Sequence, residues 1–246
     1  MKKFTSFYTY TLLASSILFS ACSNDEDATT AGTVAVTVQH VVGTEPLQLE
    51  DATYTSPTGA SYTVSSLKYY ISNVKLLNSA GAAVYMEKES YHLIDQAGKL
   101  SFELKEVPAD TYSKLQFSIG IDEDLNHRID YQGDLDATND MVWDWNTGYK
   151  FISLVGNFTG STRSGGLVFH VGGDANYKTL TLDLPTPLNL RQKSSYRVQL
   201  QADVNELFQN PNLIDFDQMS SAGHGTGPNL LADNYSNGFI RVISAD

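Results

Sequence analysis

Apolar and polar residues alternate in most readable segments of this 246-residue chain. Val34, Val36 and Val38 share one face of a predicted strand, and residues 196–202 repeat the pattern as Tyr-Arg-Val-Gln-Leu-Gln-Ala. A period of two is typical of strands that bury one face. The pattern predicts strands over residues 33–41, 67–77, 91–95, 112–121, 150–157, 166–171, 178–184 and 195–204.

Turn-forming residues separate these segments, at 56–59, 78–81, 108–110, 160–166 and 185–187. No helix longer than a few turns is expected, and residues 204–208 and 229–234 are the short candidates. Short strands at even spacing favour a sandwich. The sequence therefore predicts an all-β protein: one immunoglobulin-like β-sandwich domain with long loops and few short helices, over residues 33–246.

The first residues resemble an export signal. Lys2 and Lys3 precede an apolar run over 10–19, and Phe19-Ser20-Ala21-Cys22 follows. This is similar to a bacterial lipoprotein signal over residues 1–21, with Cys22 as the lipidated residue, although an aliphatic residue is more usual than Phe19. The apolar run is too short to cross a bilayer. We expect a cell-envelope protein, an outer-membrane lipoprotein that touches the membrane through its lipid anchor only.

Residues 22–32 read as a flexible tether, acidic at 25–27. This tract resembles the one that follows the lipid cysteine in surface-exported lipoproteins of Bacteroidetes-type bacteria, and an ordinary linker is the alternative. Because Cys22 is the only cysteine, no disulfide forms within the domain. Loss of the leader takes the formal charge from −12 to −14, since Lys2 and Lys3 leave with no acid. A strongly acidic chain without a basic stripe argues against nucleic-acid binding.

Carboxylates are dense in the predicted loop over residues 122–140. Such a loop has ligands for calcium, but it lacks the Asp-x-Asp-x-Asp-Gly spacing with a closing glutamate. A solvated acidic loop with Asx turns is therefore favoured. Gly-x-Ser-x-Gly and His-Glu-x-x-His are also absent from the sequence, and the lone cysteine offers no free thiol for catalysis. We expect a binding protein and not an enzyme.

The five histidines are the best candidate ligands, because imidazole suits copper and zinc. His40 lies in phase with buried valines, so a structural role is expected, and His92 is expected to hydrogen-bond locally near a strand end. His127 lies in the acidic loop. His170 and His224 are flanked by glycines that leave the ring accessible, and no zinc-finger spacing occurs.

Both tryptophans lie in one motif, Met-Val-Trp-Asp-Trp-Asn-Thr-Gly-Tyr-Lys-Phe, over residues 141–151. Trp143 and Trp145 are two residues apart, so on a strand they would point to the same face. Two interpretations stay open from the residues alone. The rings anchor the sandwich core, or they belong to a functional site.

Several segments together resemble the MbnP-like copper-binding proteins, exported β-sandwich proteins of methanotrophs and Bacteroidetes. The resemblance covers about residues 33–246, and the tryptophan motif at 141–151 is its strongest part. The other matching segments are residues 39–43, 67–74, 91–95, 120–122, 126–127, 133–136, 169–173 and 232–235. This chain lacks the four cysteines of one branch of that family.

The resemblance implies a specific chemistry. Relatives are paired with a di-haem, MauG-like peroxidase that oxidises a tryptophan to kynurenine, and histidines near it hold copper. Carried over, the modified residue would be Trp143 or Trp145. The copper ligands would be His170 and His224, with His127 third. The competing hypotheses are a surface module that recognises glycan or protein through exposed aromatic rings, and a purely structural lipoprotein.

Overall fold

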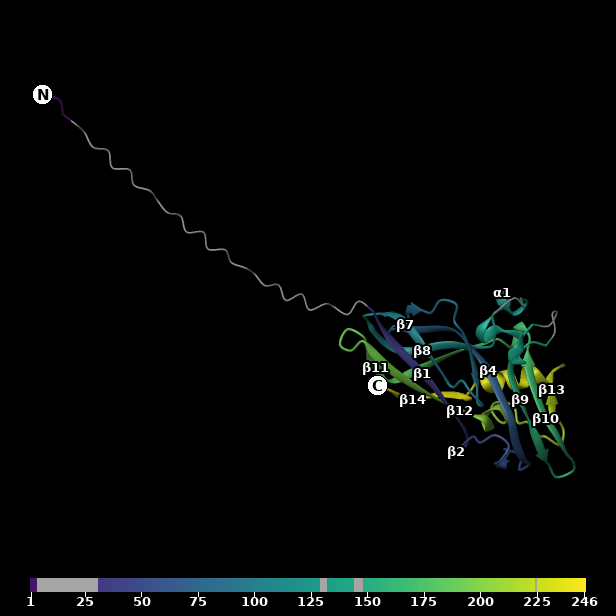
Figure 1. Ribbon diagram of the computed structural model, residues 1–246. Coiled ribbons are helices and arrows are strands. Elements are labelled where there is room, and N and C mark those ends of the chain that lie inside the picture. The colour runs from purple at the N-terminus through teal and green to yellow at the C-terminus, as the bar shows by residue number, and fades with distance from the viewer. Residues whose placement is uncertain (4–30, 129–131, 144–147, 224) are drawn as a thin grey trace.

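Two β-sheets pack face to face around one main core in the computed structural model (Figure 1). The structure describes residues 1–3, 31–128, 132–143, 148–223 and 225–246. The predicted all-β sandwich is confirmed. Within the described residues, no helix is long and apolar enough to span a membrane.

The smaller sheet has five strands in the order β14-β12-β1-β2, with β7 paired to β1. β1 and β12 are parallel, with Val36 opposite Val198. The strands of this sheet are β1 (Ala31–Val42), β2 (Glu45–Pro46), β7 (Ser101–Pro108), β12 (Ser195–Asp203) and β14 (Ile240–Ala245).

The larger sheet has nine strands in the order β11-β8-β4-β9-β10-β13, with β3, β5 and β6 also paired to β4. β4 is its longest member and pairs with β3, β5, β6, β8 and β9 along its length. The strands are β3 (Tyr54–Thr55), β4 (Ser61–Leu77), β5 (Ala83–Met86), β6 (Tyr91–Asp95), β8 (Thr111–Ile119), β9 (Lys150–Thr159), β10 (Ser164–Gly172), β11 (Lys178–Asn189) and β13 (Ser221–Ala222).

Short helices lie in the connections. They are α1 (Glu123–Asn126), η1 (Gly133–Leu135), η2 (Ala137–Asn139), η3 (Asp174–Asn176), η4 (Val204–Phe208) and α2 (Gly227–Tyr235). The two helices expected from the sequence correspond to η4 and α2. The acidic loop folds into α1, η1 and η2. Its carboxylates cap turns and accept hydrogen bonds. Asp122, for example, accepts a hydrogen bond from the Tyr91 hydroxyl.

A second, smaller core explains how this insertion attaches to the sheet. Tyr70 of β4, Leu93 of β6 and Phe151 of β9 point away from the main core and pack with Leu135, Met141 and other apolar residues of the insertion. The segment between β8 and β9 therefore covers the outer face of the larger sheet. It brings the tryptophan motif to that face.

Three expectations from the sequence were wrong. β7 and β14 were missed. β14 fully buries only Ile240 and Ala245, and in β7 the adjacent exposed residues Lys105 and Glu106 interrupt the alternation. Residues 185–187 were predicted as a turn but lie within β11, where the pairing register with β8 shifts. β1 begins at Ala31, so the predicted tether boundary at residue 32 falls inside a strand.

The chain enters the sandwich at one end and presents the insertion at the other. β1 begins near β7 and β11, whereas α1 and β13 lie at the opposite end (Figure 1). The predicted signal peptide, Cys22 and most of the tether lie outside the described residues.

Candidate functional site

Trp143 lies at the end of the insertion, in a tight hairpin-like segment. The Trp143 amide donates to the Gly148 carbonyl over 3.0 Å, and the Lys150 amide donates to the Met141 carbonyl over 2.6 Å. Only an isolated bridge joins Val142 to Tyr149, so the expectation that Trp143 lies on a regular strand was wrong. Trp145 lies outside the described residues.

Two glycines from distant strands leave space for the Trp143 indole. A Cβ on Gly172, at the end of β10, would lie 2.8 Å from the indole Nε1. A Cβ on Gly223, just after β13, would lie 3.2 Å from Cη2 at the other side of the ring. Because both positions are glycine, the half-buried indole fits against the backbone of both strands.

The imidazole of His170 meets this indole edge to face. The two ring centroids are 5.8 Å apart, and the planes are nearly perpendicular at 88°. Phe169 and Val171 of β10 point into the main core, so the alternation of the strand directs His170 to the outer face. The sheet thus brings a histidine and a tryptophan together from separate parts of the chain.

His170 also differs from the other described histidines in its hydrogen bonding. His40 contacts Gln96 and Tyr69, His92 contacts Glu87, and His127 contacts Asp174. Among the described residues, neither ring nitrogen of His170 has a hydrogen-bond partner. Its nitrogens are therefore available to a ligand, whereas the expected structural roles of His40 and His92 are confirmed.

The surroundings of His170 favour the neutral ring. Partial burial lowers the pKa of His170, and the positive charge of Lys150 lowers it further. The Lys150 ammonium donates to the Asp140 carbonyl over 2.9 Å, and Lys68 donates in the same way to the Asn139 carbonyl over 3.1 Å. Two lysines of the sheet thus hold the end of the insertion beside the histidine.

His127 belongs to a separate hydrogen-bonded group at the same edge. Its Nε2 lies 3.0 Å from Asp174 of η3, and Asn126 donates to the same carboxylate over 2.7 Å. Asn126 in turn accepts from the Tyr149 amide. The contact with Asp174 engages Nε2 of His127, whereas His170 has no such partner among the described residues.

His224 and Cys22 lie outside the described residues. Gly223, which precedes His224, contacts Trp143. No group of three His, Cys, Asp or Glu side chains suited to a metal occurs within the part of the chain that the structure describes. The described portion of the site is thus one imidazole, one indole and the two glycines beside it.

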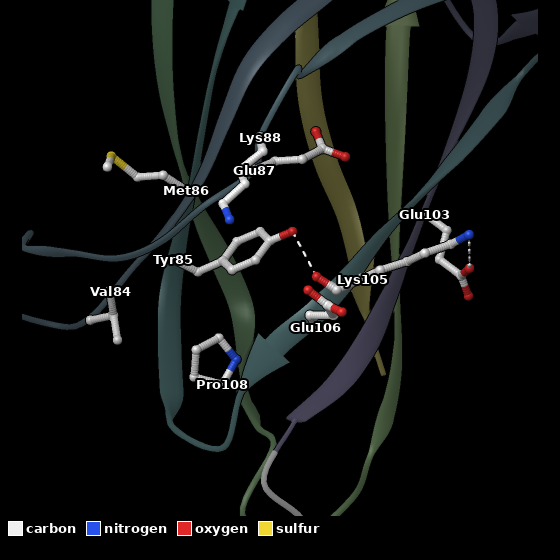
Figure 2. Close-up of a pocket in the computed structure, with 9 residues that line it drawn as sticks. All are labelled: Val84, Tyr85, Met86, Glu87, Lys88, Glu103, Lys105, Glu106 and Pro108. Carbon is white, nitrogen blue, oxygen red and sulfur yellow. Dashed lines mark hydrogen bonds and ion pairs between the residues drawn. The ribbon is translucent and has the colours of Figure 1, made fainter.

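A groove also lies elsewhere on the protein. It has a volume of about 530 Å³ and runs between the edge strands β5 and β7. Figure 2 shows Tyr85 reaching the Lys105 carbonyl across it, with Met86 pointing outward. Glutamates and lysines line the groove, so it carries both negative and positive charges. Charged side chains are common on edge strands, where they prevent pairing with other chains.

Comparisons with known proteins identify the family of this chain. The family model described as MbnP matches residues 31–224. The chain belongs to the MbnP family. MbnP from Methylosinus trichosporium, a solved structure, superposes with a TM-score of 0.55 over 78% of this chain and 81% of that chain, at 15% identity. At that identity the likeness establishes the shared fold. No curated protein matches this chain.

Within this member of the MbnP family, sequence reasoning missed three residues of the site. Gly172 and Gly223 were read only as flexible neighbours of histidines, not as the surfaces on which the indole packs. Lys150 was read only as part of the tryptophan motif. Its proximity to His170 depends on the pairing of β9 with β10, where Lys150 lies opposite Gly172.

Proposed function

We propose that this MbnP-family protein is a lipid-anchored copper-binding protein of the cell envelope, which captures or carries copper and is not an enzyme. His170 and His224 would hold the ion, with His127 as a third candidate. The observation that carries the proposal is His170 itself: an outward imidazole with uncommitted nitrogens, set against Trp143.

The donor chemistry fits copper as cargo. Imidazole nitrogen is a preferred ligand of copper, and only the neutral ring binds a metal. The lowered pKa of His170 keeps its ring neutral at physiological pH, which reduces competition from protons. The second imidazole that we propose is that of His224, which follows Gly223 directly in the sequence.

Trp143 is the tryptophan that we propose for oxidation to kynurenine by a di-haem, MauG-like partner. Overall this conversion cleaves the C2–C3 bond of the indole, adds one oxygen atom to the side chain as a ketone and releases the C2 carbon as formate. The oxidising equivalents would come from peroxide through the haem enzyme. The indole beside His170 would then become an aniline ring that keeps the former indole nitrogen as an amine and carries a ketone, whose oxygen is one additional polar atom.

The test is intact-mass and metal analysis of protein purified from its own host, with a variant series. The wild type is expected to contain near-stoichiometric copper. His170→Ala combined with His224→Ala is expected to abolish stoichiometric binding, and His92→Ala serves as a control because His92 is committed to Glu87. Unchanged copper affinity in the double variant would remove both residues from the site.

The alternative is a recognition module for glycan or protein. It requires aromatic faces that are open to a partner. Trp143 is instead packed against Gly172, Gly223 and His170. This packing supports the copper site over the recognition module for Trp143.

A further inference from the structure

Asp217 makes an unusually complete set of hydrogen bonds for a residue in a surface turn. Its Oδ2 accepts from the Ser161 amide over 2.9 Å, the Ser161 hydroxyl over 2.7 Å and the Thr162 amide over 3.1 Å. Its Oδ1 accepts from the Arg163 amide over 3.2 Å. Residues 160–163 form the turn between β9 and β10, so one carboxylate ties the segment before β13 to that turn. We call this set of contacts the Asp217 clasp.

Three further contacts secure the same segment. Arg163 donates to the Phe216 carbonyl over 3.2 Å and to the Ser220 hydroxyl over 2.7 Å. The Val168 amide of β10 donates to the Ser220 carbonyl over 2.9 Å. The segment over residues 216–220 therefore lies along β10, fixed near the start of that strand.

The clasp lies just before β13, a strand that makes few hydrogen bonds to its neighbour β10. β13 contains only Ser221 and Ala222, and it pairs with β10 through Val168 and Phe169. The next residue, Gly223, contacts the Trp143 indole. A two-residue strand at a sheet edge contributes few hydrogen bonds. Besides the burial of Phe216 and Ala222 in the main core, the position of β13 therefore depends on the hydrogen bonds that fix the chain before it.

The chain after this point is fixed again by α2. The Tyr235 hydroxyl of α2 donates to the Asn176 carbonyl, and Asn234 donates to the Leu207 carbonyl over 2.8 Å. Only residues 223–226, which include His224, connect β13 to α2. This short connection begins at Gly223, directly on the indole.

We propose that Asp217 is a positioning residue of the candidate site, because its clasp on the β9–β10 turn holds the chain that places Gly223 close to Trp143. Hydrogen bonds to a carboxylate are stronger than those between neutral groups, and these bonds also lower the pKa of Asp217 to about 2. The clasp therefore stays charged throughout the physiological pH range. This inference deepens the proposed copper function and rests on it only for the copper measurement.

The test uses the domain with Trp145→Phe, so that fluorescence reports Trp143 alone. In Asp217→Ala, we expect acrylamide to quench Trp143 at least about twofold more efficiently, since Gly223 no longer covers the ring. Copper affinity is expected to fall about tenfold. Asp110→Ala is the matched control, because Asp110 also accepts from a turn amide and an arginine, but near the start of β8. It should change neither measurement.

The outcomes separate this proposal from the copper function. A folded Asp217→Ala variant with wild-type quenching would overturn it. If Asp217→Ala does not fold, Ser161→Ala removes one clasp bond, and unchanged quenching in that variant would equally overturn the proposal. If the wild type binds no copper, the proposed function fails, and the quenching result still decides whether Asp217 positions the chain on Trp143.

Discussion

The indole of Trp143 and the imidazole of His170 meet edge to face, with ring centroids 5.8 Å apart and planes at 88°. The two residues come from different elements: Trp143 ends the insertion after α1, and His170 lies on the outward side of β10. Aromatic rings prefer this perpendicular geometry. The contact therefore holds the one described histidine with uncommitted nitrogens beside the one described tryptophan.

Trp143, and not Trp145, is expected to be the oxidised residue. Trp143→Phe should remove the mass change of the native protein, and Trp145→Phe should retain it, because Trp143 is the ring held against His170 and Gly172. Intact-mass and peptide-mass spectrometry of both variants from the native host measures this. Retention of the modification in Trp143→Phe would assign it to Trp145.

Gly172→Ala is expected to displace the indole. The new Cβ would lie 2.5 Å from the Tyr149 carbonyl and 2.8 Å from the indole Nε1, and the backbone carbonyl cannot move freely. Overpacking of this kind costs about 1–3 kcal/mol of unfolding free energy. Gly165→Ala is the control in the same strand, where nothing lies within 4 Å of the added atom. Urea unfolding and near-ultraviolet circular dichroism compare the two; equal stability in both variants would contradict the packing argument.

Lys150→Met is expected to raise the pKa of His170. Burial, the larger cause of the lowered pKa, remains in the variant, so the pKa should stay below its ordinary value of 6.5. Lys150→Arg keeps the charge and should leave the pKa of His170 near that of the wild type. Titration of the imidazole resonances by NMR on metal-free protein measures both. A pKa that does not differ between the Met and Arg variants would show that the charge has no influence.

His40 is expected to make the fold sensitive to acid. Burial lowers the pKa of His40 to about 4, against 6.5 in the unfolded chain. The unfolded state therefore binds this proton first as pH falls, and stability is lost progressively between pH 6.5 and 4, by roughly 3 kcal/mol in total. The hydrogen-bond partners of His40 fit the neutral ring. The Gln96 amide nitrogen donates to the Leu47 carbonyl, so the Gln96 amide oxygen accepts from His40 Nδ1. The Tyr69 hydroxyl donates to His40 Nε2.

The measurement is the unfolding free energy as a function of pH in wild type and His40→Gln. The variant should be less stable at pH 7, since it loses the fit to both partners, but its stability should vary less between pH 6.5 and 4. Parallel pH profiles for His40→Gln and wild type would exclude His40 as the source.

The class of fold was predictable from local pattern. Alternation placed Val34, Val36 and Val38 in the core, and it placed His40 in phase with them. Strands at the sheet edges were not predictable in the same way. β14, for example, buries only Ile240 and Ala245 fully, so its sequence carries a weak alternation signal.

The composition of the site depended on long-range contacts. Residue type alone made His170, His127 and His224 equally eligible ligands, and Trp143 and Trp145 equally eligible for oxidation. The tertiary structure committed His127 to Asp174 and left His170 uncommitted beside Trp143. No local sequence pattern shows which histidine has a carboxylate partner and which lies beside a tryptophan, because the partners are distant in sequence.

The sequence by itself determined that this chain forms an all-β sandwich, since side-chain alternation is a local property of each strand. It also determined which residues are chemically able to bind copper. Only the tertiary structure decided that Gly172 and Gly223 flank Trp143 and that Lys150 lies close to His170, whereas the Asp217 clasp lies at the turn that closes the other end of the β9–β10 hairpin. Those relationships arise from the register of β9, β10 and β13, which pairs residues that no local rule connects.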